Sequence, residues 1–222
     1  MAVREETVVV ATGDESAFKA FVAYARGESK GGVVILHEIF GLTEQLKSVA
    51  RSYADDGFDT IVPALFNRVS CQTVVPFDDP DEGRELMRRL DIEEVMIDID
   101  AARDYIDQGN GVSVLGFSLG GGLALKAAAT LSFKSAVSYY GAKLTNFLDA
   151  PPKCPMQFHF GDTDMMTEPD VINSLRNSIP DAETYIYPAG HSFANDATDT
   201  YVSDAALPAL ERSVSFLNTH HR

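Results

Sequence analysis

The fold is decided by the stretch VSVLGFSLGGG, residues Val112–Gly122. Its first part, Val112–Leu115, is a short run of mainly apolar residues typical of a buried strand, and Leu119–Thr130 follows with the composition of a helix. Between them, Gly116-Phe117-Ser118-Leu119-Gly120 has the pattern G-x-S-x-G. A serine between a strand and a helix in this pattern occupies a turn so tight that small residues are needed beside it. The turn exposes the hydroxyl at the edge of a sheet, so Ser118 is predicted to be a nucleophile.

The same position gives Leu119 a predicted role. Its backbone N–H lies in the first turn of the helix, where it has no partner within the helix and can bond a developing oxyanion. The positive end of the helix dipole favours the same charge. Two other interpretations of the motif stay open at this point: a glycine-rich helix start capped by a serine, or a loop that binds phosphate.

A serine nucleophile needs a base, and the base needs an acid. Of the five histidines, His191 follows the predicted strand Glu183–Tyr187 in a loop, which suits a base. We expect His159, inside a strand, to be a core histidine bonded to backbone. The acid should lie between serine and histidine in the chain. We favour Asp164 over Asp162, because Asp162 is well placed to stabilise the turn itself.

Strands alternate with helices along the chain, which predicts an α/β fold with a mostly parallel central sheet and helices on both faces. An antiparallel hairpin at the sheet edge precedes this pattern, and Ala64–Pro80 is predicted to be a long loop. We expect one domain over residues 1–222. The predicted strands are Thr7–Val10, Phe18–Tyr24, Gly32–Leu36, Phe58–Val62, Val112–Leu115, Ala136–Tyr140, Met156–Phe160 and Glu183–Tyr187. The predicted helices are Thr43–Asp56, Asp81–Gln108 with a break near Asp91, Leu119–Thr130, Pro169–Asn177 and about Thr200–Asn218.

The composition restricts the partners. The formal net charge is −15, from 33 acidic residues against 18 Lys and Arg. Such a surface repels phosphate backbones and anionic membranes, so we expect no nucleic-acid partner and no membrane partner. The two cysteines, Cys71 and Cys154, form no CxxC pair and no metal-ligand cluster, so neither a metal nor a disulfide framework is expected. No signal peptide is evident, and the interpretation is a cytoplasmic protein, monomeric or a small homo-oligomer.

Several motifs together resemble the dienelactone hydrolase (carboxymethylenebutenolidase) family of α/β-hydrolases over nearly the whole chain. They are His37-Glu38-Ile39-Phe40-Gly41, Pro63-Ala64-Leu65-Phe66, Gly116–Gly122, Tyr139-Tyr140-Gly141, Gly161-Asp162-Thr163-Asp164 and Ala189-Gly190-His191-Ser192-Phe193. The resemblance implies the α/β-hydrolase fold, and it places the acid on Asp164 and the base on His191.

The resemblance also implies roles that the residues alone do not. It makes Glu38 an auxiliary group that activates the nucleophile, and the N–H of Ile39 a second oxyanion donor. A family arginine after the long loop matches Arg84 best, with Arg88 as the alternative, and Arg84 and Tyr140 are the candidate substrate-binding residues.

The chain departs from the family at two positions. The best-known members have a cysteine where this chain has Ser118, and an arginine four residues after the histidine, where this chain has Asn195. We therefore expect a serine hydrolase that cleaves carboxylic esters or lactones through an acyl-enzyme, without a cofactor, and leave its substrate open between a general ester and a dienelactone. The alternatives are an acyl transferase or perhydrolase on the same triad, and a non-catalytic ligand-binding protein of this fold.

Overall fold

The computed structural model describes residues 3–70, 74–167 and 169–221. Within it the chain forms two compact units, residues 1–113 with His221 and residues 114–220. The boundary falls within strand β5 (Val112–Phe117). The expectation of a single domain stays a prediction.

The first unit contains four strands in the order β1-β2-β4-β3. Strands β1 and β2 form an antiparallel hairpin at one edge, as predicted, and β2 pairs antiparallel with β4. Strands β3 and β4 are parallel and entirely buried, which explains their continuous apolar sequences. The bounds are β1 (Arg4–Ala11), β2 (Ala17–Tyr24), β3 (Gly32–Leu36) and β4 (Asp59–Pro63).

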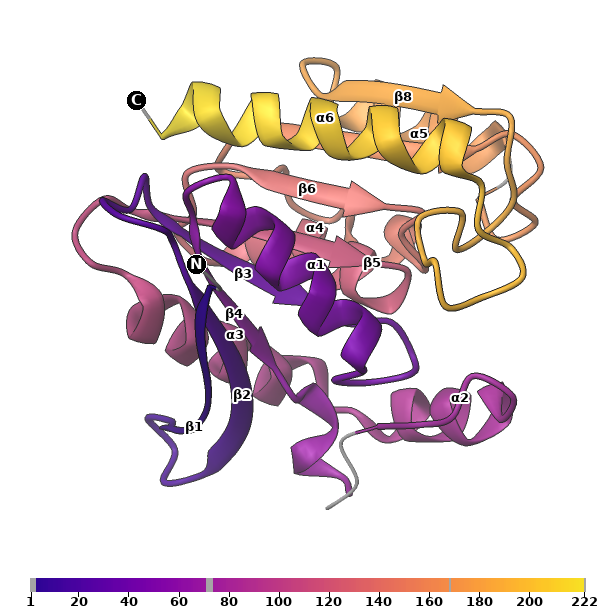
Figure 1. Cartoon of the computed structure of the whole chain (residues 1–222). Helices are drawn as coiled ribbons and strands as arrows, with labels where there is room; N and C mark the ends of the chain where they lie inside the picture. Colours follow the sequence, from indigo (N-terminus) through magenta and orange to yellow (C-terminus); the bar gives the residue numbers. More distant parts are fainter. Residues whose placement is uncertain (1–2, 71–73, 168, 222) are drawn as a thin grey trace. The chain divides into compact units, whose positions relative to one another are not determined.

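Helices α1 (Glu44–Asp55) and α3 (Ile92–Ile106) pack on these strands, and α1 lies in front of them and α3 behind in Figure 1. The side chain of Thr43 caps α1 by accepting the N–H of Leu46. Helix α2 (Pro80–Arg89) ends before Asp91, whose carboxylate accepts the N–H groups of the first turn of α3. The predicted break near Asp91 is confirmed, and an N-cap is its cause.

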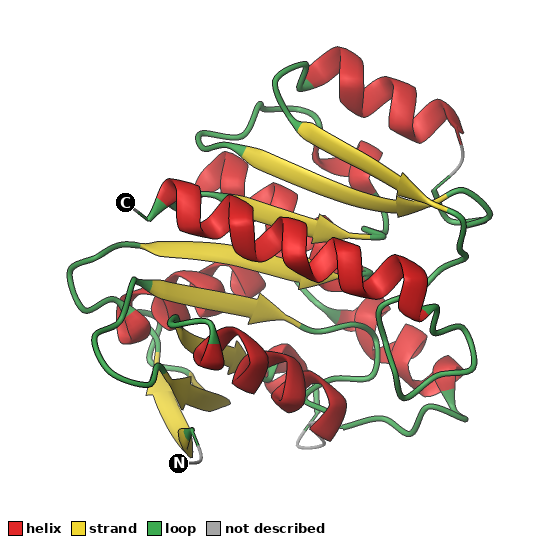
Figure 2. Cartoon of the chain, turned by 45° about the horizontal axis from the view of Figure 1, so that its top comes forward, coloured by secondary structure: helices red, strands yellow, loops and turns green. Residues whose placement is uncertain are grey.

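The second unit is a parallel sheet in the order β5-β6-β7-β8. Figure 2 shows its strands in yellow with helices in red on either side. The bounds are α4 (Leu119–Thr130), β6 (Ala136–Tyr139), β7 (Met156–Gly161), α5 (Pro169–Ser178), β8 (Glu183–Tyr187) and α6 (Ser203–His220). The loops after β5, β6, β7 and β8 all leave the carboxyl ends of parallel strands, so they meet at one edge of this sheet.

The prediction of a long loop from Ala64 to Pro80 is wrong at its start, where the chain is helical. Leu65–Arg68 forms a 3-10 helix (η1), with Leu65 and Phe66 fully buried, and Gly41 forms a bridge with Val74. Residues 71–73 of that segment, including Cys71, lie outside the described residues. A second 3-10 helix, η2 (Leu144–Phe147), follows β6. Across the described ranges, none of the helices combines the length and apolarity that a membrane span requires.

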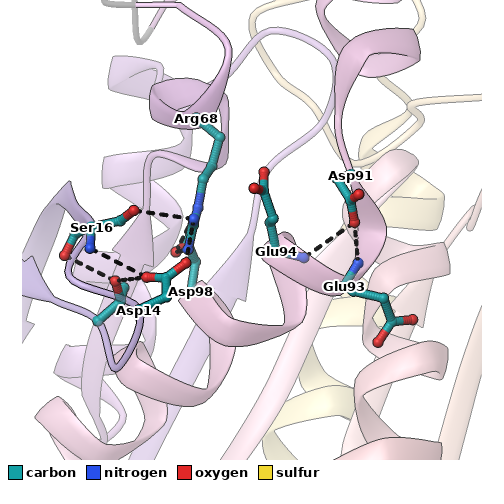
Figure 3. A network of polar contacts seen from close by, with 8 residues as sticks. Asp14, Ser16, Arg68, Asp91, Glu93, Glu94 and Asp98 are labelled. Atoms are coloured by element: carbon teal, nitrogen blue, oxygen red, sulfur yellow. Dashed lines mark hydrogen bonds and ion pairs between the residues drawn. The ribbon is translucent and has the colours of Figure 1, made fainter.

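A buried ion pair fastens three segments of the first unit (Figure 3). Arg68, at the end of η1, donates to the carboxylate of Asp98 on α3, with an Nη2–Oδ1 distance of 2.6 Å. The exposed fractions of the two side chains are only 9 % and 1 %. Arg68 also reaches Asp14 in the β1–β2 turn, at 2.7 Å. The pair thus holds together the hairpin, η1 and α3.

We predict that Asp98→Asn destabilises the protein by about 3 kcal/mol, because it leaves the buried guanidinium of Arg68 with only the partly exposed Asp14 as a charged partner. The measurement is the denaturant midpoint of unfolding. The matched control is Asp81→Asn, which breaks the exposed Arg84–Asp81 pair and should cost less than about 1 kcal/mol. Equal costs for the two variants would contradict a structural role for the buried pair.

Candidate active site

Ser118 lies between β5 and α4 in a strained backbone conformation, with φ 49° and ψ −110°. A positive φ in a non-glycine residue costs on the order of 1–3 kcal/mol and persists only where the surroundings impose it. The glycines of the motif make this possible. A Cβ on Gly116 would overlap the backbone of Gly120, so a side chain at residue 116 would force the turn open. The predicted tight turn is confirmed.

Three predicted residues come together in the second unit. The Oγ of Ser118 lies 2.8 Å from Nε2 of His191, and Nδ1 of His191 lies 2.8 Å from Oδ2 of Asp164. Ser118 and Asp164 are buried, with exposed fractions of 7 % and 4 %. The His191 side chain keeps 24 % of its surface exposed. Because Nδ1–H donates to the carboxylate, Nε2 is left as an acceptor for the serine proton.

The carboxylate of Asp164 is held from several sides. Its Oδ1 accepts the N–H of Met166 at 2.8 Å, and its Oδ2 accepts the hydroxyl of Thr167 at 3.1 Å. Burial opposes ionisation, but the hydrogen bond and charge of His191, with these two donors, outweigh it and hold the pKa of Asp164 below its ordinary value. The acid is therefore ionised and oriented toward the imidazole at neutral pH.

Asp162 has a different place. It is exposed, and its Oδ1 accepts the N–H of Ala189 at 3.1 Å. This bond ties the loop after β7 to the loop that carries His191. The structure thus brings Asp164, not Asp162, to the histidine, and the expected turn-stabilising contact of Asp162 is present.

The other predicted site residues are placed as follows. Leu119 is the first residue of α4, so its N–H has no partner within the helix. Glu38 and Ile39 follow β3 in the first unit, with Glu38 buried. Arg84 lies on α2 in an exposed ion pair with Asp81. Tyr140 is fully buried beside His191, with ring centroids 5.1 Å apart.

Asn195, at the position of the family's arginine, is buried and forms hydrogen bonds within its own loop. Its Oδ1 accepts the N–H of Ala197 at 3.1 Å, and its N–H donates to the carbonyl of Ser192. A neutral amide used in this way offers no cation to a substrate carboxylate. Nowhere in residues 3–70, 74–167 or 169–221 do three or more His, Cys, Asp or Glu side chains gather in a cluster that could hold a metal ion.

Sequence reasoning missed two residues that support the cluster of Ser118, His191 and Asp164, namely Thr167 and Phe193. Thr167, three residues after Asp164, donates its hydroxyl to the Asp164 carboxylate, a local contact that no motif in the sequence indicated. Phe193 packs on Tyr140 with centroids 5.2 Å apart, and Tyr140 packs on His191. These ring contacts form only when the chain is folded, because they join residues of different loops, so no pattern in the sequence predicts them.

His159 is a core histidine as predicted, but the expectation that it bonds to backbone through its ring is wrong. Its Nδ1 lies 2.8 Å from the hydroxyl of Tyr187 and its Nε2 2.8 Å from Oε1 of Gln157, while Ser213 lies 3.0 Å away. Because Arg212 donates to the Tyr187 hydroxyl, that hydroxyl can donate its own proton to Nδ1. Neutral side chains thus satisfy both ring nitrogens.

Comparison with known proteins gives a consistent result. The family model described as "Dienelactone hydrolase family" matches residues 18–221. A carboxymethylenebutenolidase of Pseudomonas putida is 31 % identical over 228 residues, which cover 96 % of this chain and 95 % of that protein. A putative carboxymethylenebutenolidase of Saccharolobus solfataricus is 29 % identical over 245 residues, covering 92 % and 95 % of the two chains.

Solved structures agree on the fold. The crystal structure of a putative dienelactone hydrolase from Klebsiella pneumoniae superposes with a TM-score of 0.85 at 21 % identity, covering 97 % of this chain and 98 % of that one. The fold class expected from the sequence is confirmed.

Two buried histidines predict acid sensitivity. Burial lowers the pKa of His37 to about 4, and burial with the charge of Arg212 lowers that of His159 to about 3, from 6.5 for each. Below pH 6.5 the unfolded chain binds protons that the folded chain does not, so stability falls as the pH falls toward 3. For His159 the loss is on the order of 4 kcal/mol. Unfolding free energies of wild type and His159→Gln between pH 7 and 4 test this, and an equal pH slope in the two proteins would contradict it.

Proposed function

Because this chain belongs to the dienelactone hydrolase family and is a hydrolase, we propose that it cleaves carboxylic esters or lactones through an acyl-enzyme on Ser118. The observation that carries the proposal is a pair of 2.8 Å contacts. One joins Oγ of Ser118 to Nε2 of His191, and the other joins Nδ1 of His191 to Oδ2 of the buried Asp164. This geometry is the one that converts a weakly nucleophilic hydroxyl into an attacking alkoxide.

The first half of the reaction forms the acyl-enzyme. Nε2 of His191 accepts the proton of Ser118 as Oγ attacks the ester carbonyl, and Asp164 stabilises the resulting imidazolium. The tetrahedral oxyanion is held by the N–H of Leu119, at the positive end of α4. His191 then gives its proton to the departing alkoxide, and the acyl group remains on Ser118.

The second half releases the acid. A water molecule gives a proton to His191 and attacks the acyl carbonyl, and collapse of the second tetrahedral intermediate returns the proton to Ser118. The activating role of Glu38, the second oxyanion donor Ile39 and the substrate contact of Arg84 stay predictions drawn from the family.

The substrate class is an ester or a lactone with an accessible carbonyl. The P. putida and S. solfataricus relatives carry the name carboxymethylenebutenolidase, which supports a lactone. The neutral, internally bonded Asn195 supports substrates that lack a carboxylate at the position where the family's arginine would bind one. Rates of hydrolysis over paired neutral and anionic esters and lactones measure this preference directly.

Ser118→Ala should fold normally and lose ester hydrolysis by a factor on the order of 10⁶ in kcat, the cost of removing the nucleophile in serine proteases. The measurements are the turnover of p-nitrophenyl acetate and mass spectrometry after treatment with an organophosphate. Wild type should gain one adduct, located on Ser118, and the variant none. A folded Ser118→Ala protein with wild-type turnover would refute the proposal.

Asp164→Asn should reduce kcat roughly 10⁴-fold, because the imidazole loses the partner that sets its tautomer and stabilises its positive form. Asp162→Asn is the matched control, because it makes the same chemical change in the same loop at a carboxylate that accepts the N–H of Ala189 rather than facing His191. We expect it to retain most of the turnover. The reverse ranking would move the acid to Asp162 and leave the hydrolase class intact.

A further inference from the structure

One turn after strand β6, residues Tyr139–Ala142, holds the backbone of the nucleophile from both sides. The N–H of Ser118 donates to the carbonyl of Tyr139 at 3.0 Å, and the N–H of Ala142 donates to the carbonyl of Ser118 at 2.8 Å. Any displacement of this turn therefore moves Ser118 with it.

The same turn also supports the base. The ring of Tyr140 meets the imidazole of His191 edge-on, with centroids 5.1 Å apart and an interplanar angle of 63°. The ring of Phe193, two residues beyond His191, packs on Tyr140 at 5.2 Å and 72°. Asp164 orients the imidazole through one nitrogen, and Tyr140 restricts it by packing against its ring.

Tyr140 is itself held in a strained conformation, with φ 36°. An aromatic residue adopts a positive φ only where its neighbours require it. The N–H of Tyr140 donates to the carbonyl of His159 at 2.7 Å, and His159 is fixed in turn by its bonds to Tyr187 and Gln157. Gly141 completes the turn, because a Cβ there would lie 2.5 Å from Oγ of Ser138.

We propose that Tyr140 is a positioning residue, whose ring fixes the imidazole of His191 within hydrogen-bonding distance of Ser118. The proposal rests on the proposed function, because it concerns the same triad. It replaces the substrate-binding role expected for Tyr140 from the sequence: a ring with no exposed surface is placed to support the base. The positive φ of Tyr140 lets its turn hold the backbone of Ser118 while its ring packs against the imidazole of His191.

Two substitutions at this position separate the possible roles. Tyr140→Phe keeps the ring, so kcat and KM should stay close to wild type. Tyr140→Leu removes the aromatic edge, so kcat should fall roughly 10- to 100-fold with KM little changed, because small misplacements of a catalytic group cost rates of this order. If the hydroxyl of Tyr140 instead binds substrate, Tyr140→Phe raises KM, and the proposal is overturned.

The matched control is Phe158→Leu, an equally buried aromatic-to-leucine change on β7 whose ring stacks on Phe160. It should lower the melting temperature without lowering kcat. All rates are expressed per active site titrated by organophosphate, so that unfolded protein does not count. If Tyr140→Leu does not fold, Phe193→Leu loosens the same support from its other side and should lower kcat.

The outcomes distinguish the two proposals. A wild-type protein that neither gains the organophosphate adduct nor hydrolyses esters contradicts the proposed acyl-enzyme on Ser118. In that case there is no turnover that a change at Tyr140 could lower. A labelled, active wild type with wild-type kcat in both Tyr140→Leu and Phe193→Leu contradicts the positioning role alone. A loss of kcat in Phe158→Leu as large as that in Tyr140→Leu also contradicts it, because the effect is then one of core packing.

Discussion

The backbone of Ser118 is the constraint on which the site depends. Its φ of 49° is unfavourable for a residue with a side chain, and the chain accepts it only because the flanking glycines leave room and two hydrogen bonds from the Tyr139–Ala142 turn hold it. The bent strand end directs the hydroxyl to the carboxyl edge of the sheet and begins α4 at the next residue. One local distortion thus places the hydroxyl of Ser118, the N–H of Leu119 and the positive end of the α4 dipole together.

Asp164 and His191 reach this serine from the ends of β7 and β8, which lie next to each other in the sheet. Asp164 is fixed by the N–H of Met166 and the hydroxyl of Thr167, and His191 by Asp164 and the ring of Tyr140. Four consecutive parallel strands therefore each contribute one loop to the site. Three of those loops contain non-glycine residues with a positive φ above this regular parallel sheet: Ser118 after β5, Tyr140 and Lys143 after β6, and Ser192 after β8.

Much of this arrangement was predictable from the sequence. The buried strands were visible as runs of apolar residues, and the division of α2 from α3 as an aspartate before Glu93 and Glu94. The juxtaposition of Ser118, His191 and Asp164 was predictable because G-x-S-x-G favours a later acid and base, and His191 was the histidine predicted to lie on a suitable loop. Helix η1 was not, because four residues are too few to show a helical period. Nor were the contacts of His159 with Tyr187 and Ser213 or the packing of the Tyr140 ring on His191, since these contacts join residues far apart in the chain.

The bonds that hold residue 118 have a consequence for how the family diversifies. Both hydrogen bonds from the Tyr139–Ala142 turn go to the main-chain atoms of Ser118, its N–H and its carbonyl, and the clearance comes from glycines on either side. These backbone contacts therefore do not depend on whether the side chain carries an oxygen or a sulfur atom. Selection can exchange oxygen for sulfur at this position through a single codon change, with the turn intact, and tune reactivity afterwards through the groups that face the side chain. Because these bonds involve only main-chain atoms, the side chain at residue 118 can change in evolution without loss of the backbone contacts that position it.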